Sequence, residues 1–361
     1  MEESKKEEHE KGAEIRALKS FRDRSNLKNG GMKDMGNNDL LQETFNLLDK
    51  RYGINRIKRA DELPQTKDSI VSTGIIGLDA ALGVGGIKKG SIIEIYGPES
   101  GGKTTLALQM CRRFQKQGKP VLYIDTERTL TRETIGSMGI ETDSFYVLNV
   151  DTLENALETC KIAAQMTAFS VVVIDSLAGL APKAEIDGDV GDHHVGLISK
   201  IMSQTLPVLT TYFADSGCTL IVITQIREKV DVMFGNPERA TGGRALKYYA
   251  TVRLDMRRVE SIKNNGEIAG SRTRVKVVKN KIASPFKEAE FDIMFGEGIS
   301  IEGDILDNAV EKEVITKNGT WFSYNGNRIG QGRENAKQYL REHPAEMGEI
   351  TTKLREQIFG D

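Results

Sequence analysis

Residues 97–104 read Gly97-Pro98-Glu99-Ser100-Gly101-Gly102-Lys103-Thr104 and match the pattern G-x-x-x-x-G-K-[ST]. The apolar run SIIEIYG (91–97) precedes this stretch, and a segment with helical periodicity, TTLALQMCRRFQKQG, follows its lysine. The glycines let backbone N–H groups approach phosphate oxygens, and a helix that begins there adds its positive dipole. Lys103 is expected to contact the β- and γ-phosphates, and the Thr104 hydroxyl is expected to bind Mg²⁺. The stretch, continued by Thr105, therefore predicts a site for ATP and Mg²⁺.

Three carboxylates follow apolar runs elsewhere in the chain. Asp175 ends the run VVVID (171–175), as a residue that holds Mg²⁺ through water does in phosphate-loop enzymes. Glu127 stands just beyond the run VLYID (121–125), where it could act as a general base on the attacking water. Asp125, at the end of the same run, competes for that role.

Apolar runs of β type alternate with helix-like segments between about residues 65 and 300. Besides those above, the runs are FYVLNV (145–150), TLIVIT (219–224), ATVRLDM (250–256) and TRVKVVKN (273–280). Near-continuous Val/Ile runs indicate strands that are buried on both faces. The predicted class is therefore α/β, with a mostly parallel central sheet flanked by helices.

The ends of the chain have a different character. Residues 1–37 are dense in charge and are predicted to form a disordered arm, and 38–64 are predicted to form a linker and a subunit-docking helix. Asp39 is the expected cap of that helix and Gly53 its stop. Residues 65–300 form the predicted core. Residues 301–361 are expected to form a small C-terminal α/β domain that ends in one helix, from ENAKQYLREH through TTKLREQIF.

The composition of the 361 residues excludes several classes of protein. Lys+Arg 50 against Asp+Glu 52 gives a net charge of -2, which argues against bulk electrostatic coating of nucleic acid. Three scattered cysteines exclude a disulfide framework and a Cys-rich zinc site. No apolar run is long enough to cross a bilayer, and the first residues do not resemble a signal peptide. A cytoplasmic protein without a membrane partner is expected.

The longer motifs resemble those of the bacterial RecA recombinase family over roughly residues 65–340. The segments that carry the resemblance are GPESGGKTTLALQ, YIDTE, VVVIDSLAGLAPKAEI, QIREKVDVMFGNPERATGGRALKYYATVRLDMRR, TRVKVVKNKIASPF and GEGISIEGD. The resemblance implies a P-loop core of the RecA type. It also implies an ATPase that forms a helical filament of its own subunits on single-stranded DNA and exchanges strands with double-stranded DNA. Repressor or mediator proteins are further possible partners, and a RecA-like DNA motor or ring helicase is the alternative.

The resemblance also assigns roles to single residues. Glu127 would be the catalytic carboxylate, with Lys103 and Asp175 beside it. Gln225 would sense the γ-phosphate and transmit its presence to a DNA-binding loop. Lys279 and Lys281 would reach the ATP of a neighbouring subunit. Thr131 and Thr134 stand where the family has an Asp and a Tyr near the adenine, which leaves Phe295 as the side chain that could stack on the base.

Two segments resemble the mobile DNA-binding loops of the family, Glu185–Val195 before Lys200 and Ile226–Thr241 before Gly242-Gly243. Positive side chains there are expected to contact phosphates and apolar ones to press on bases, while the two glycines let backbone amides approach the strand. The residues with these roles are Lys200, Arg227, Lys229, Arg239 and Arg244 for phosphates, and Val230, Met233 and Phe234 for bases, with Gly242 and Gly243.

Overall fold

The computed structural model describes residues 37–53, 57–63, 65–189, 196–228, 238–240, 243–264 and 266–360. Contacts divide the chain into two units, Met1–Pro64 and Gln65–Asp361. In the first unit, helix α2 (Asn37–Tyr52) begins before the expected cap, so Asp39 lies within its first turn. Gly53 follows the helix with φ +97°, and its N–H donates to the Asp49 carbonyl at 2.9 Å. A short 3-10 helix, η1 (Ala60–Glu62), comes after it.

A large mixed sheet forms the centre of the second unit. Its strand order is β12-β11-β10-β9-β3-β7-β6-β4-β5, and β8 pairs with β7. The strands from β9 to β5 run parallel to their neighbours, while β9 to β12 pair antiparallel. The predicted α/β class with a mostly parallel core is confirmed. The strands are β3 (Ile92–Gly97), β4 (Val121–Asp125), β5 (Phe145–Leu148), β6 (Val171–Asp175), β7 (Thr219–Glu228), β8 (Glu238–Ala240), β9 (Val252–Asn264), β10 (Glu267–Asn280), β11 (Glu288–Met294) and β12 (Gly298–Ile299).

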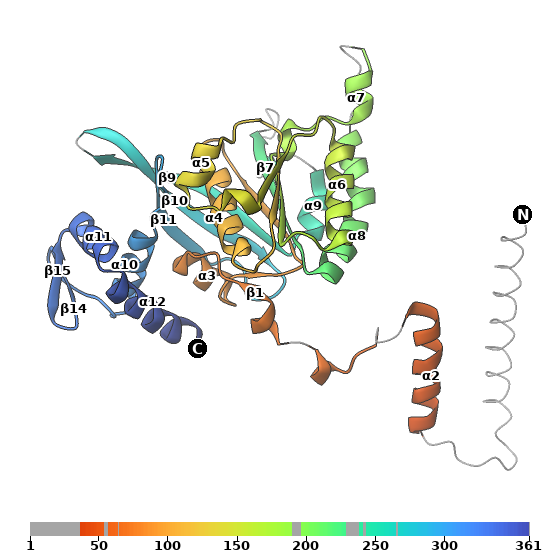
Figure 1. Cartoon of the computed structure of the whole chain (residues 1–361), viewed down its shortest axis with the longest axis horizontal. Coiled ribbons are helices and arrows are strands. Elements are labelled where there is room, and N and C mark those ends of the chain that lie inside the picture. Colours follow the sequence, from red (N-terminus) through yellow and green to blue (C-terminus); the bar gives the residue numbers. More distant parts are fainter. Residues whose placement is uncertain are drawn as a thin grey trace, which may run out of the picture. The chain divides into compact units, whose positions relative to one another are not determined.

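Helices cover both faces of the parallel strands. Successive side chains of each strand point to opposite faces and join two different apolar clusters. Ile93 and Ile95 of β3 pack with α3 and α4, whereas Ile92 packs with α6, α8 and α9. Figure 1 shows α4 and α5 on one side of these strands and α6 and α8 on the other. The helices are α3 (Ile76–Leu82), α4 (Lys103–Gln115), α5 (Arg132–Ser137), α6 (Leu153–Met166), α7 (Lys183–Asp187), α8 (Leu197–Ser216) and α9 (Gly243–Tyr249), with η2 (Thr66–Ser69), η3 (Thr142–Ser144) and η4 (Leu177–Gly179).

Strands β9 and β10 extend well past the apolar runs that predicted them. They form a long antiparallel hairpin in which Glu267 lies opposite Asn264. The outer part of this hairpin is mostly exposed and polar, so backbone pairing rather than apolar burial holds it. An apolar-run criterion therefore finds only the inner half of each strand.

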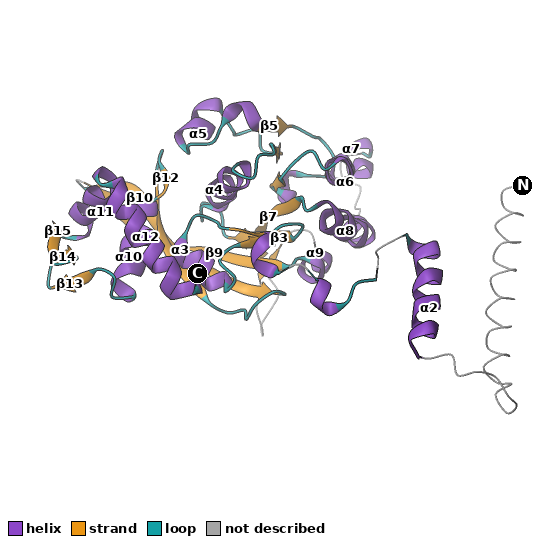
Figure 2. Ribbon diagram, turned by 60° about the horizontal axis from the view of Figure 1, so that its bottom comes forward, coloured by secondary structure: helices purple, strands orange, loops and turns teal. Residues whose placement is uncertain are grey.

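The C-terminal residues fold onto one end of the sheet, as Figure 2 shows. The predicted single final helix is wrong: α11 ends at Glu342 and α12 begins at Pro344. Proline has no backbone N–H to continue a helix, but it fits the first position of a new one. The elements are α10 (Ile301–Glu311), β13 (Thr316–Asn318), β14 (Trp321–Tyr324), β15 (Asn327–Gln331), α11 (Arg333–Glu342) and α12 (Pro344–Phe359), and β1 (Ile70–Val71) pairs with β2 (Ile87–Lys88) near the start of the unit. No helix in the described part of the chain is long and apolar enough to span a membrane.

A buried carboxylate joins α10 to the start of α3. Asp304 accepts hydrogen bonds from the backbone N–H groups of Ile76 and Gly77 at 2.5 and 3.1 Å, and from Asn308 Nδ2 at 3.0 Å. It thus satisfies amide groups that the first turn of a helix leaves unpaired. Burial nevertheless raises the pKa of Asp304 to about 7, from an ordinary value of 3.8.

We expect Asp304→Asn to change how stability depends on pH. The folded pKa lies above the unfolded one, so the folded parent binds more protons and loses stability as pH rises from about 4 to 7. The variant lacks this group, so its free energy of unfolding should rise relative to the parent across that window, by at most about 1.4 kcal/mol per pH unit. Urea unfolding at several pH values measures this difference. A difference that stays constant with pH would contradict the prediction.

Candidate nucleotide site

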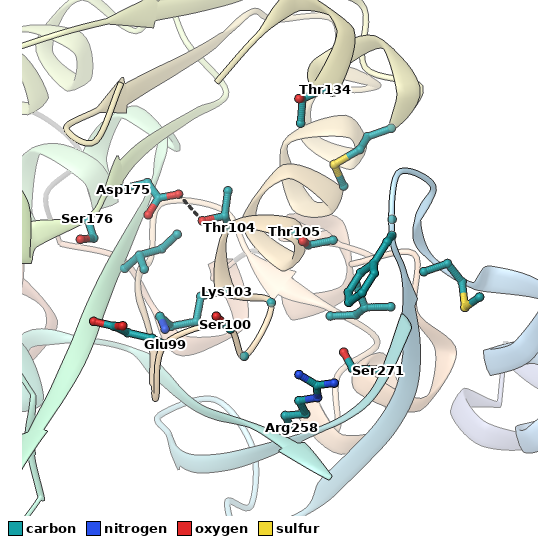
Figure 3. A pocket seen from close by; sticks show the side chains of 18 of the residues that line it. Glu99, Ser100, Lys103, Thr104, Thr105, Thr134, Asp175, Ser176, Arg258 and Ser271 are labelled. Carbon is teal, nitrogen blue, oxygen red and sulfur yellow. Dashed lines mark hydrogen bonds between the residues drawn. The ribbon is translucent and has the colours of Figure 1, made fainter. Parts of the chain in front are cut away.

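A cavity of about 830 Å³ lies where the carboxyl ends of the parallel strands meet the start of α4. Its floor is the glycine-rich turn between β3 and α4. A Cβ on Gly97 would lie 2.1 Å from the Met256 carbonyl oxygen, and Gly102 has φ +88°. Both positions therefore require glycine. Figure 3 shows Asp175 and Ser176 on one side of the turn, and Arg258 and Ser271 on the other.

Lys103 lies at the start of α4 with its amine turned to the loop. Its Nζ donates to the carbonyl oxygens of Gly97 at 3.1 Å and Pro98 at 2.6 Å. Burial lowers the pKa of Lys103, and the carboxylates of Asp175, Glu99 and Glu127 act in the opposite direction. A cation held among carbonyl groups at the mouth of a helix N-terminus is suited to a phosphate.

Thr104 and Asp175 meet across the cavity. Thr104 Oγ1 donates to Asp175 Oδ2 at 2.6 Å (Figure 3), and the fully buried Tyr123 hydroxyl donates to the same oxygen at 2.6 Å. Burial raises the pKa of Asp175, while both hydrogen bonds act to lower it. Among the described residues, no group of three His, Cys, Asp or Glu side chains forms a metal cage. A hydroxyl next to one carboxylate fits Mg²⁺, which keeps several waters and takes its other ligands from phosphates.

Tyr123 is a site residue that the sequence motifs do not identify. It lies in the middle of the buried run VLYID, where an aromatic side chain is expected to serve packing alone. Only the pairing of β4 with β6 brings its hydroxyl to Asp175. A tyrosine in an otherwise aliphatic buried strand is the available signal, since a buried hydroxyl needs a partner.

The two carboxylates that compete for the general-base role differ in position. Glu127 is exposed, lines the cavity and accepts a hydrogen bond from Ser176 Oγ at 3.3 Å. Asp125 is buried, and its Oδ2 accepts the Leu130 N–H at 2.9 Å. The cavity-lining residues include Glu127 and leave out Asp125.

Gln225 lies at the cavity beside the phosphate loop. In the parallel pair β3 and β7, Gln225 is directly opposite Gly97. Strand β7 then continues to Glu228 and pairs antiparallel with β8, so that Ile226 lies opposite Ala240. Within the predicted loop Ile226–Thr241, residues 226–228 and 238–240 are thus paired strands, whose backbone groups satisfy one another.

The predicted DNA-binding residues fall into two groups. Arg227 in β7 lies opposite Arg239 in β8 in the strand register, Gly243 begins α9, and Arg244 and Lys200 are exposed on α9 and α8. The residues Lys229, Val230, Met233, Phe234 and Gly242 lie outside the described residues, as do 190–195 of the other predicted loop. The start of that loop is not a loop, since residues 183–187 form α7.

Lys279 and Lys281 lie at the C-terminal end of α9. Lys279 Nζ donates to the carbonyl oxygens of Lys247 at 2.8 Å and Tyr248 at 2.7 Å, and Lys281 Nζ donates to that of Tyr249 at 3.4 Å. Amines near the last carbonyls of a helix complement its dipole. Lys281 lies past the end of β10, and a register shift in the pairing of β10 with β9 falls between Val277 and Lys279.

Two of the three residues expected near the adenine line the cavity. Phe295 is exposed at the rim, and Thr134 lines the wall. Thr131 does not line the cavity, because its hydroxyl caps α5 by accepting the Thr134 N–H at 3.2 Å. Arg258 and Ser271, which come from the long hairpin, also line the cavity and were not predicted.

Comparisons with known proteins agree with one another. A family model described as the RecA N-terminal domain matches residues 39–300, and one described as the RecA C-terminal domain matches 303–359. Protein RecA of Clostridium novyi (strain NT) is 51% identical over 316 residues, which cover 88% of this chain and 90% of that protein. Protein RecA of Geobacter sulfurreducens (strain ATCC 51573 / DSM 12127 / PCA) is 53% identical over 310 residues, 85% of this chain and 91% of that protein.

Tyr123→Phe tests the hydrogen bond to Asp175. Phenylalanine fills the same space, so the change removes only a donor to a buried carboxylate, and the free energy of unfolding should fall by about 1.5–3 kcal/mol. Urea unfolding measures this loss. The matched control is Tyr324→Phe, which removes a hydroxyl from the C-terminal part that interacts with exposed charges and should cost less than about 1 kcal/mol. Equal losses of unfolding free energy in the two variants would contradict the prediction, because the buried bond to Asp175 would then stabilise the fold no more than an exposed one.

Proposed function

The chain belongs to the RecA family, and from this premise we propose how its residues divide the work of a DNA-dependent ATPase. The protein is an ATP-dependent DNA recombinase, as its membership of this family establishes. The family binds nucleotide and DNA and assembles on itself, and the residues that perform these tasks here are proposed below.

The phosphate end of ATP would lie on the turn between β3 and α4. Lys103 would exchange its carbonyl acceptors for β- and γ-phosphate oxygens. Thr104 and Asp175 would hold Mg²⁺, which supplies charge neutralisation at the phosphates. Phe295 at the rim would stack on the adenine, with Thr134 beside it.

Glu127 would accept the proton of the attacking water. Its carboxylate lines the cavity, and the Ser176 hydroxyl orients it. Asp125 has the wrong location for this role, because its carboxylate binds a backbone amide in the interior.

The coupling of hydrolysis to DNA rests on one pairing, that of Gly97 with Gln225. A γ-phosphate bound at the loop would lie beside Gln225, and the same strand leads within a few residues to the segment 229–237. We propose that this segment, with Arg227, Arg239 and Arg244, contacts single-stranded DNA through phosphates that carry no sequence information. Lys279 and Lys281 would complete the ATP site of a neighbouring subunit in a helical filament. Double-stranded DNA is the proposed second substrate, and mediator or repressor proteins are further proposed partners.

The same scheme divides the chain. We propose that residues 1–37 form a charged arm, that 38–64 dock on a neighbouring subunit, that 65–300 form the ATPase core and that 301–361 form an accessory domain. The first unit supports the docking role, because Leu40, Leu41 and Leu47 of α2 are exposed.

Glu127→Gln should separate binding from hydrolysis. The amide oxygen keeps the acceptor for Ser176, but it cannot take a proton, so turnover should fall by about 10²–10⁴-fold while ATP and DNA binding persist. Steady-state ATPase and fluorescent-nucleotide binding measure the two effects. Asp125→Asn is the matched control and should retain turnover; if it, and not Glu127→Gln, abolishes hydrolysis in a folded protein, Asp125 is the base.

Strand exchange tests the whole proposal. We expect hydrolysis to rise when single-stranded DNA is added, and joint molecules to form with a homologous duplex but not with a heterologous one. Gel assays of joint molecules and an ATPase titration with DNA measure these outcomes. DNA-stimulated hydrolysis without joint molecules would instead support a DNA motor or ring helicase, and electron microscopy would then show closed rings.

A further inference from the structure

Glu94 is a buried carboxylate in the middle of the parallel sheet, outside the nucleotide cavity. It lies on β3, three residues before the phosphate loop, and is only 1% exposed. Its Oε1 accepts Thr224 Oγ1 at 3.1 Å, and its Oε2 forms an ion pair with Arg253 Nε. The Arg253 guanidinium also lies 4.6 Å from the centre of the Tyr96 ring.

Each residue of this cluster lies close to a residue with a proposed role in hydrolysis. Glu94 leads to Gly97 along β3, and Thr224 is the residue before Gln225 on β7. Arg253 on β9 lies opposite Lys279 on β10. One carboxylate therefore connects the strands that carry the phosphate loop, the proposed γ-phosphate sensor and a proposed trans-acting lysine.

The packing around Glu94 does not require a charged side chain. The neighbouring side chains on the same face of the sheet include Ile92 and Val222, which pack in the apolar cluster against α8 and α9. Burying an ion pair costs desolvation, and well-packed apolar side chains are often as stable or more so. What a buried pair with directional hydrogen bonds provides instead is one fixed arrangement of its partners.

We propose that Glu94 is a positioning residue that couples Gln225 and Lys279 to the phosphate loop by fixing the strands β3, β7 and β9 relative to one another. The inference rests on the proposed function for what Gln225 and Lys279 do. Lys279 also binds the last carbonyl groups of α9, the helix that follows the proposed DNA-binding segment in the chain.

The charge around Lys279 provides a readout that packing alone would not change. Burial and the positive charges of Lys281, Arg253 and Lys247 lower the pKa of Lys279 to about 8, while the negative charge of Glu94 acts to raise it. Removing the negative charge of Glu94 should therefore shift the titration of Lys279 to lower pH.

The main test is Glu94→Gln, which keeps the shape and one acceptor oxygen but removes the charge and the second acceptor. We expect nucleotide affinity within about twofold of the parent and DNA-stimulated turnover lowered about tenfold, because small misplacements of catalytic groups cost rate far more than binding. Fluorescent-nucleotide titration and ATPase assays with single-stranded DNA measure these values. The matched control is Glu288→Gln, which makes the same change at an exposed ion pair with Lys276 and should behave as the parent.

The second readout needs neither DNA nor ATP. The rate at which acetic anhydride labels Lys279, followed by mass spectrometry against pH, should have its midpoint lower in Glu94→Gln than in the parent and unchanged in Glu288→Gln. Should Glu94→Gln fail to fold, Thr224→Val removes one arm alone and should lower stimulated turnover about threefold at unchanged nucleotide affinity.

Parent-like turnover in both Glu94→Gln and Thr224→Val would overturn the proposal, as would turnover and nucleotide affinity that fall in parallel. An unmoved Lys279 midpoint would overturn the link to that lysine. A parent that shows no DNA-stimulated hydrolysis would refute the proposed function instead, and the labelling experiment would still decide whether Glu94 acts on Lys279.

Discussion

The approach of Gly97 to the Met256 carbonyl is the constraint on which the site depends. A Cβ on Gly97 would lie only 2.1 Å from that oxygen, so the last residue of β3 must be glycine for the chain to turn this close to the neighbouring strand. The turn delivers Lys103 and Thr104 at the first residues of α4, where unpaired amide groups and the helix dipole favour an anion. The position of the proposed phosphate site thus depends on the close packing of β3 against β9.

Several of the proposed functional residues lie on strands close to the central strand β3. Strand β7 on one side carries Gln225, and β6 next to it carries Asp175. On the other side, β9 carries Arg253 opposite Glu94, and β10 carries Lys279 opposite Arg253. Since parallel strands end at the same edge, small shifts between them would change the distance between a phosphate bound at the loop and Gln225, its proposed sensor. Glu94 lies among these strands where β3 pairs with both β7 and β9.

Much of this arrangement was predictable from local sequence. The apolar runs located the inner strands, and the glycine-rich motif located the nucleotide site, because both signals depend on neighbours in the chain. The outer hairpin of β9 and β10 escaped prediction, since exposed polar residues there are held by backbone pairing. The break between α11 and α12 was missed although Pro344 signals it, because the apolar periodicity continues on both sides. The predictions for residues 190–195 and 229–237 lie outside the described residues.

The sequence by itself determined the phosphate loop, the α/β class and the family, because each is a contiguous pattern whose chemistry is local. Only the tertiary structure decided which of Asp125 and Glu127 faces the cavity, since both lie at the end of the same buried strand or just beyond it. It also decided that the Tyr123 hydroxyl binds Asp175, that Lys279 holds the end of α9, and that Glu94 meets Thr224 and Arg253. These contacts join residues 31 to 159 positions apart, and strand order and register, rather than local propensity, bring them together.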